Sequence, residues 1–173
     1  RLAEGGEIVV SQRLKRLPRI VRKLHRMDTN LARLEDIGGC RAVLANGPEL
    51  LRVERRLRKR WASQIVRDRN YIEDPKDIGY RAVHLVVQRD GRRIEVQLRT
   101  VGQQQWADAI ESIDARLGLT MKDGDGPDDL VRYFNLAGSV IHAREYGLTI
   151  AKDLADDFQA AREAVIRAGY YRR

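Results

Sequence analysis

The segment that most constrains the fold is a pair of alternating stretches joined by an Asp-Gly dipeptide. Residues 79–88 and 93–100 alternate between polar and apolar side chains, which is the pattern of half-buried β-strands. Asp90 and Gly91 lie between them, and both central positions of a tight hairpin turn require a positive φ. The sequence therefore predicts two neighbouring antiparallel strands.

The second of these strands has two chemically different faces, because successive side chains point to opposite sides of a sheet. One face carries apolar side chains at positions 94, 96 and 98. The other carries Glu95, Gln97 and Arg99. The apolar face predicts core packing, and the polar face predicts an open surface with another role.

The rest of the chain contains both strand and helix patterns. Strands are predicted at residues 7–15, 37–45 and 64–68, and helices at 18–26, 48–60 and 101–117. Trp106, Ile110 and Ile113 recur at helical spacing and are expected core residues. A loop at 122–129 precedes two amphipathic helices that are separated near Gly147.

These elements predict an α+β fold, with a mixed β-sheet of about five strands flanked by helices and a C-terminal helical pair. The 173 residues are expected to form a single domain, 1–173, with a core region at 7–118 and C-terminal helices at 128–173. A hydrophobic fraction of 43% supplies a core, and a charged fraction of 34% keeps the surface solvated.

Composition excludes several classes of protein. The apolar runs are too short to cross a membrane and no signal peptide is visible, so no membrane partner is expected. Cys40 is the only cysteine, which excludes an internal disulfide and a Cys-based zinc site and favours a cytoplasmic location. The chain begins at Arg1, so we expect a piece of a longer protein.

The net charge of +8 favours polyanionic partners, namely RNA, nucleotides or an acidic inhibitor protein. An arginine-rich surface without a specific partner is the alternative, because the arginines are spread along the chain.

Residues 74–99, taken with 33–41, bring together the chemistry of a nucleotide site. They supply a lysine, a tyrosine, a histidine and several arginines, and two acids, Asp36 and Glu95. Two acids suit Mg²⁺, cations suit phosphates and an aromatic ring suits a base. This set predicts nucleotide phosphoryl transfer.

Five ordered blocks resemble the synthetase domain of the RelA/SpoT superfamily, the nucleotide pyrophosphokinases that make alarmones. The blocks span residues 12–111: Arg13-Leu14-Lys15 followed by Lys23-Leu24, the D-x-x-G-x-R at 36–41, the P-K-x-x-G-Y-R-x-x-H at 75–84, the E-x-Q-x-R-T at 95–100, and the W-A-x-x-x-E at 106–111.

The resemblance implies a role for each matched position. Asp36 would bind Mg²⁺, and Glu95 would bind Mg²⁺, activate the attacking hydroxyl, or do both. The ATP-binding set would be Arg13, Lys15, Arg19, Lys23 and Arg41. The acceptor would be held by Lys76, Ile78, Tyr80, His84, Gln97 and Arg99, with Tyr80 stacked on its base and Lys76 and His84 on its phosphates.

Structural roles remain open for several of these residues. Asp36 also suits a turn cap, Tyr80 suits ordinary packing, and His84 suits a hydrogen-bonded strand position. Lys15 and Lys23 also suit a plain cationic surface.

Two positions depart from the family pattern. Ile78 stands where synthetases that use GDP or GTP commonly have an Asn that helps to read guanine. Because isoleucine cannot hydrogen-bond a base, adenine becomes the expected acceptor. Arg19 stands where the family often has Ser, and it suits either a phosphate contact or a helix surface.

The resulting hypothesis is an ATP-dependent 3′-pyrophosphokinase that acts on AMP, ADP or ATP to make (p)ppApp. We expect a bacterial toxin that depletes ATP, delivered into the cytoplasm of a target cell and paired with an acidic immunity or antitoxin protein. The alternatives are a (p)ppGpp synthetase using GDP or GTP, a tRNA 3′-end pyrophosphokinase, and a non-catalytic nucleotide- or RNA-binding module.

Overall fold

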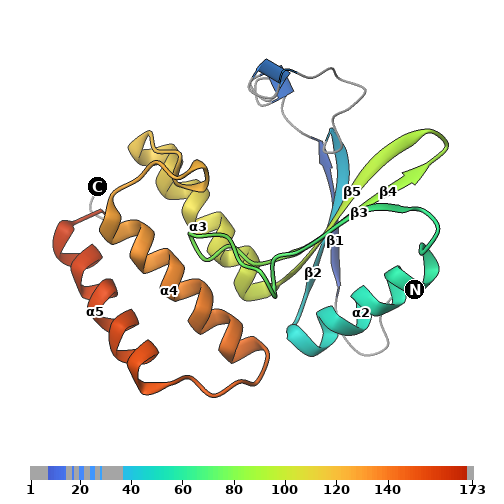
Figure 1. Ribbon diagram of the computed structural model, residues 1–173. Coiled ribbons are helices and arrows are strands. Elements are labelled where there is room, and N and C mark those ends of the chain that lie inside the picture. The colour runs from blue at the N-terminus through green and yellow to red at the C-terminus, as the bar shows by residue number, and fades with distance from the viewer. Residues whose placement is uncertain are drawn as a thin grey trace.

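A five-stranded sheet separates one helix from a group of three in the computed structural model (Figure 1). The structure describes residues 8–14, 17, 20–21, 24–25, 28 and 37–170, without the side chains of Arg13, Leu14 and Asp123. The elements are β1 Val9–Leu14, β2 Gly38–Leu44, α2 Gly47–Arg60, β3 Ile65–Asn70, β4 Val83–Arg89, β5 Arg92–Thr100, α3 Val101–Leu117, the 3₁₀ turn η2 Met121–Asp123, α4 Asp128–Glu145 and α5 Lys152–Ala168.

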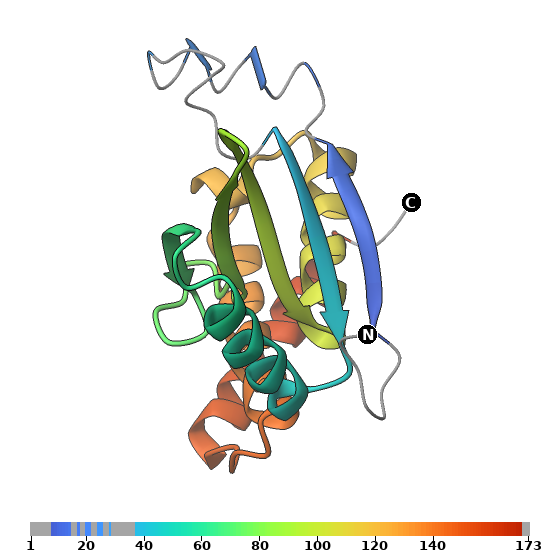
Figure 2. The same cartoon turned by 90° about the vertical axis from the view of Figure 1, so that its right-hand side faces the viewer.

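The sheet is mixed, as predicted, and its strand order is β1-β2-β5-β4-β3. The β2–β5 pair is parallel, and the other neighbours are antiparallel. Figure 2 shows the sheet with α2 in front and α3 behind. The predicted α+β class with about five strands is therefore confirmed.

The hairpin and the helix that follows it form where the sequence predicts them. Asp90 and Gly91 have φ values of 50° and 73°, as the turn requires. The N-cap residue Thr100 and Gln103 form a capping box, and Gly118 ends α3 with a φ of 69°. The sequence signals at these positions are local, which is why the boundaries were predictable.

The strand predicted at 79–88 begins later, at Val83. Gly79 has a φ of 84° and lies against the backbone of α4, where an added Cβ would come within 2.8 Å of Asn135. This contact draws residues 79–82 out of the extended conformation. The predicted loop at 122–129 also contains the end of η2 and the start of α4. The helix predicted at 18–26 lies largely outside the described residues.

Two apolar clusters hold the layers together. One joins the α2 face of the sheet to α2 through residues such as Leu85, Leu98 and Leu50. The other joins α3 to α4 and α5 and includes the predicted core residues Trp106, Ile110 and Ile113. The C-terminal helices therefore dock on the core of the same chain.

The two faces of β5 agree with the prediction in part, because Val96 and Leu98 are buried in the core as expected. Gln97 and Arg99 are only 3% and 4% exposed, whereas Ile94, expected in the core, is 43% exposed. Arg99 is covered because β5 runs directly into α3, so the end of its polar face lies beneath that helix. Of the three polar side chains predicted to face an open surface, Gln97 and Arg99 are buried and Glu95 is partly exposed.

Candidate functional site

A chain of hydrogen bonds crosses the sheet face opposite α2 and ends on Glu95. Arg99 Nη2 donates to the hydroxyl of Tyr80 over 2.9 Å. That hydroxyl lies 2.7 Å from Nε2 of His84. Nδ1 of His84 lies 2.9 Å from Oε1 of Glu95. Residues from β4, β5 and the preceding loop therefore converge on one carboxylate.

A second branch reaches the same carboxylate from β2. Gln97 Nε2 donates to Oε2 of Glu95 over 2.6 Å. Nε and Nη2 of Arg41 each donate to Oε1 of Gln97 over 3.4 Å. Both oxygens of Glu95 thus accept a hydrogen bond, and an arginine stands at the far end of each branch.

The protonation state of His84 gives the first branch its direction. Burial lowers the pKa of His84 below its usual range, although Glu95 works against this shift. A neutral imidazole has one donor and one acceptor nitrogen. With Nδ1–H donating to Glu95, Nε2 accepts from the hydroxyl of Tyr80. Every donor in the branch therefore points toward the carboxylate and favours its charged form.

Strand register explains how distant parts of the chain meet here. In the parallel pair, Gly39 of β2 lies opposite Glu95 of β5. A Cβ at position 39 would lie 2.5 Å from the carbonyl oxygen of Glu95, so the close approach needs glycine. Arg13 of β1 is aligned with Gly39 on its other side. Three strands that are separate in sequence thus meet beside Glu95.

Lys76 and Tyr80 lie together before β4. The ammonium of Lys76 lies 5.2 Å from the ring centroid of Tyr71 and 5.7 Å from that of Tyr80. The Tyr80 ring is only 8% exposed and contacts Tyr71 and Trp106. The structure therefore encloses the ring that was expected to stack on a base.

Ile78 is enclosed by apolar side chains, and His84 is hydrogen-bonded, which was the structural alternative left open for it. Ile78 is buried in the apolar cluster around Trp106. Both ring nitrogens of His84 are engaged by Tyr80 and Glu95. In this arrangement Ile78 fills the core and His84 orients the carboxylate. Their contacts with an acceptor stay a prediction.

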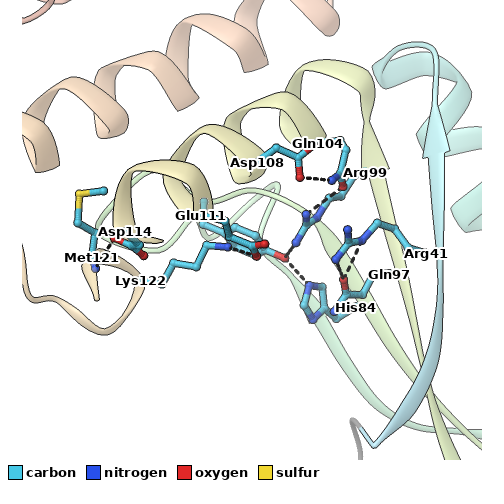
Figure 3. Close-up of polar contacts among 11 residues, drawn as sticks. Arg41, His84, Gln97, Arg99, Gln104, Asp108, Glu111, Asp114, Met121 and Lys122 are labelled. Atoms are coloured by element: carbon cyan, nitrogen blue, oxygen red, sulfur yellow. Dashed lines mark hydrogen bonds and ion pairs between the residues drawn. The ribbon is translucent and has the colours of Figure 1, made fainter. Parts of the chain in front are cut away.

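Three residues near the site had not been singled out in the sequence. Tyr71 packs edge-on against the rings of Tyr80 and His84. Arg99 Nη1 donates to Oε1 of Gln104 over 3.1 Å, and Gln104 in turn donates to Asp108 over 2.7 Å (Figure 3). The four-residue spacing of Gln104 and Asp108 is the one signal that places them on a common helix face.

The remaining predicted residues cannot be placed around Glu95. Asp36, Lys15, Arg19 and Lys23 lie outside the described residues, and only the backbone of Arg13 is described. Within the described ranges, no group of three or more His, Cys, Asp or Glu side chains is arranged to hold a metal ion. Ile37 and Gly38 lead from position 36 into the strand that carries Gly39.

None of the helices within the described ranges combines the length and apolar character that a bilayer span requires.

The chain is similar to a family model and to several known proteins. The family model described as "Region found in RelA / SpoT proteins" matches residues 12–115. An uncharacterised protein of Mycobacterium tuberculosis is 30% identical over 73% of this chain and 46% of its own length. The GTP pyrophosphokinase YwaC of Bacillus subtilis is 26% identical over 75% of this chain and 66% of its own length. The chain thus spans about half the length of the first of these relatives.

The fold of the chain is also similar to that of a solved structure. The small alarmone synthetase 2 of Bacillus subtilis is 26% identical and superposes with a TM-score of 0.64, covering 80% of this chain and 77% of its own.

Proposed function

Because this chain belongs to the RelA/SpoT family, we propose that it is a pyrophosphokinase that transfers the β,γ-pyrophosphate of ATP to the 3′-hydroxyl of a nucleotide. The observation that carries the proposal is the arrangement around Glu95. Its carboxylate accepts from His84 and Gln97, and its side chain is still 14% exposed. Its two oxygens are therefore held in place by donors at a point that a substrate can reach.

In the proposed reaction Glu95 accepts a proton. The 3′-oxygen of the acceptor bonds to the β-phosphorus of ATP, and the bond from that phosphorus to the oxygen of the α-phosphate breaks. AMP leaves with that oxygen, and the hydroxyl proton passes to Glu95. Such transfers depend mainly on positioning and charge neutralisation. Arg41, whose guanidinium lies beside Gln97, is placed to neutralise phosphate charge.

Mg²⁺ fits the proposal, because a carboxylate such as that of Glu95 is an oxygen ligand of the kind that Mg²⁺ takes in nucleotide-transfer sites. Asp36 would be the other ligand. It is three residues before Gly39, which is paired with Glu95. When bound, the ion would neutralise charge on the triphosphate. Arg13, Lys15, Arg19 and Lys23 would contact the remaining phosphate oxygens.

We further propose an adenine nucleotide as the acceptor, which gives (p)ppApp. Its support is the absence of a hydrogen-bonding side chain at position 78, where Ile78 is buried. The base would lie near Lys76 and the half-buried Tyr71, and Tyr80 would support them from below. A guanine acceptor is the second candidate, favoured by the similarity to a GTP pyrophosphokinase.

The test is a transfer assay with Mg²⁺ and γ-labelled ATP. AMP, ADP, ATP, GDP, GTP and deacylated tRNA are offered separately as acceptors. Labelled (p)ppApp is the expected product. Product with guanine nucleotides alone would overturn the adenine assignment, and product with tRNA alone would identify an RNA acceptor. If no acceptor is labelled, the chain is a non-catalytic nucleotide-binding module.

We also propose that the chain acts as a toxin that depletes ATP in the bacterial cytoplasm. Expression of the active chain is expected to stop growth and lower cellular ATP, while Glu95→Gln does neither. An acidic protein that restores growth would be the expected antitoxin. Normal growth with active enzyme present would contradict the toxin role.

A further inference from the structure

Within residues 37–170, which the structure describes continuously, positive charge gathers on α2 and β3. Residues 52–69 contain eight cationic side chains and two acids, a net charge of +6 out of the +8 of the whole chain. The eight are Arg52, Arg55, Arg56, Arg58, Lys59, Arg60, Arg67 and Arg69. When Glu49 is included, the whole of α2 and β3 has eight cations and three acids, a net charge of +5. Residues 13–26 form a second cationic run, with seven cations and no acid.

The exposed side of α2 is cationic because its acids are turned inward. Glu49 and Glu54, the two acids of α2, are both buried. Arg52, Arg55, Arg56, Lys59 and Arg60 are exposed. These five recur at spacings of three and four residues, so they form one stripe along the helix, about 12 Å long.

Helix stability does not explain this stripe. Cations in the last turn complement the helix dipole, which accounts for Lys59 and Arg60. Arg52 is paired with the buried Glu49 one turn earlier, with its Nη2 3.4 Å from Oε1. Arg55 and Arg56 have no such role in the last turn, and like charges at these spacings repel one another. The apolar side of α2 is already packed on the sheet through Leu50, Val53 and Leu57. A membrane-binding role would need that side to be free.

The cationic surface continues around the edge of the sheet. Asp68 of β3 is paired with Arg58 of α2, with Oδ1 3.0 Å from Nη2. Because side chains alternate along a strand, Arg67 and Arg69 lie on the other face, and Arg69 is opposite His84. The stripe on α2 and the candidate site thus share the β3 edge of the sheet, which Figure 2 shows beside α2.

We propose that the exposed stripe of α2, together with the β3 edge, binds the phosphate backbone of a nucleic acid. Seven of the eight cations are arginines, whose planar guanidinium pairs with phosphate through two parallel hydrogen bonds. A nucleic acid presents a continuous row of charges to match the stripe, whereas a folded acidic protein presents carboxylates scattered among other groups. This binding requires neither ATP nor transfer activity.

The test is fluorescence anisotropy with a labelled single-stranded RNA of roughly 20 nucleotides, which exceeds the length of the stripe. ATP and Mg²⁺ are left out. A DNA strand of the same length is the second arm and shows whether the sugar is read. The double variant Arg56→Glu, Lys59→Glu is compared with Arg162→Glu, Arg167→Glu on α5, which changes the net charge equally.

The stripe variant is expected to bind RNA at least about tenfold more weakly and to lower the slope of log K against log salt by about 1.4, since each phosphate contact on a single strand contributes roughly 0.7. The α5 variant and Glu95→Gln are expected to retain affinity. Equal losses in both charge variants, loss in Glu95→Gln, or tighter binding of poly-glutamate than of RNA would each overturn the proposal. Circular dichroism checks that every variant is folded.

Discussion

At the scale of single residues, the chemistry depends on how Glu95 is held. A carboxylate in a largely enclosed position is costly unless donors satisfy its oxygens. His84 and Gln97 provide those donors, and Arg99 and Arg41 stand behind them. The donors keep the carboxylate charged and in one orientation, which is what a proton acceptor needs before substrate arrives.

Glu95→Gln is expected to lower kcat by about 10²- to 10⁴-fold, the usual contribution of a positioned proton acceptor. The amide keeps the size of the side chain but cannot take the proton. Single-turnover transfer from labelled ATP measures the loss. Glu163→Gln on the exposed surface of α5 is the matched control and should retain full activity. Activity retained in Glu95→Gln would assign the chemistry to another group.

The buried histidines make stability dependent on pH. Burial lowers the pKa of His84 and of His142 in the folded chain, so the unfolded chain binds protons first as the pH falls below about 6.5. The free energy of unfolding is therefore expected to decrease from about pH 7 toward pH 5. Urea unfolding at several pH values between about 5 and 7 measures this change in the free energy of unfolding.

The variants His84→Gln and His142→Gln should each flatten this dependence, because each removes one of the two shifted groups. An unchanged slope in His84→Gln would mean that its folded-state pKa is not lowered.

At the scale of elements, the parallel pairing of β2 with β5 decides what Glu95 can meet. Gly39 allows the two backbones to approach where a side chain would collide with the carbonyl of Glu95. The same pairing aligns Arg41 with Gln97. A glycine that looks like a turn residue in the sequence is therefore a packing requirement of the site.

Gly39→Ala is expected to destabilise the chain by about 1–3 kcal/mol, as overpacking does, and to lower the transfer rate because Glu95 must shift. Thermal unfolding and the transfer assay measure the two effects. Gly91→Ala is the control. It meets open space in the hairpin turn but carries a φ of 73°, so it should cost about 1–2 kcal/mol without reducing the rate. Equal rate losses in both would refute the packing argument.

Helix α4 holds the loop that precedes β4. Asn135 donates its amide to the carbonyl of Asp77, and Gly138 lies against the carbonyl of Gly79. Lys76 and Tyr80 flank these two contacts in the loop. Trp106, which packs against Tyr80, donates its indole N–H to the carbonyl of Phe134 over 2.8 Å. The position of this loop thus depends on a helix that lies outside residues 12–115, the part that matches the family.

Asn135→Ala is expected to raise KM for the acceptor several-fold while KM for ATP changes little, because the loop loses its tether and β2 is untouched. Initial rates with each substrate varied in turn separate the two constants. Arg132→Ala, an exposed position on the same helix, is the control. A parallel rise in both KM values would point to general loosening of the fold.

At the scale of the whole molecule, the C-terminal helices complete the core. Trp106, Ile110 and Ile113 belong to the same apolar cluster as Leu130, Phe134 and Val165. A chain that stops after α3 would leave these α3 side chains in water, which removes a large part of the hydrophobic stabilisation. The residues that match the family are therefore not expected to fold without α4.

A chain ending at residue 117 is accordingly expected to lack a cooperative thermal transition and to bind the dye ANS. A chain ending at residue 151, which keeps α4, should bind less dye. Near-ultraviolet circular dichroism of Trp106 distinguishes packed from unpacked cores. A cooperative transition in the shorter chain would show that α3 finds another cover.

The sequence by itself determined the local structure and the family. The Asp90–Gly91 turn, the cap at Thr100 and the spacing of Trp106 and Ile110 each depend on neighbouring residues, so the hairpin and α3 were predictable. The ordered motifs were equally readable, because each lies within a few consecutive residues.

Only the tertiary structure decided which polar groups meet. The burial of Arg99, the enclosure of Tyr80 and the two hydrogen bonds to Glu95 arise between segments far apart in the chain. So does the docking of α4 on Gly79. The alternation of β5 shows that two faces differ but does not tell what covers each face. That depends on strand order and helix packing, which are long-range and leave no local pattern.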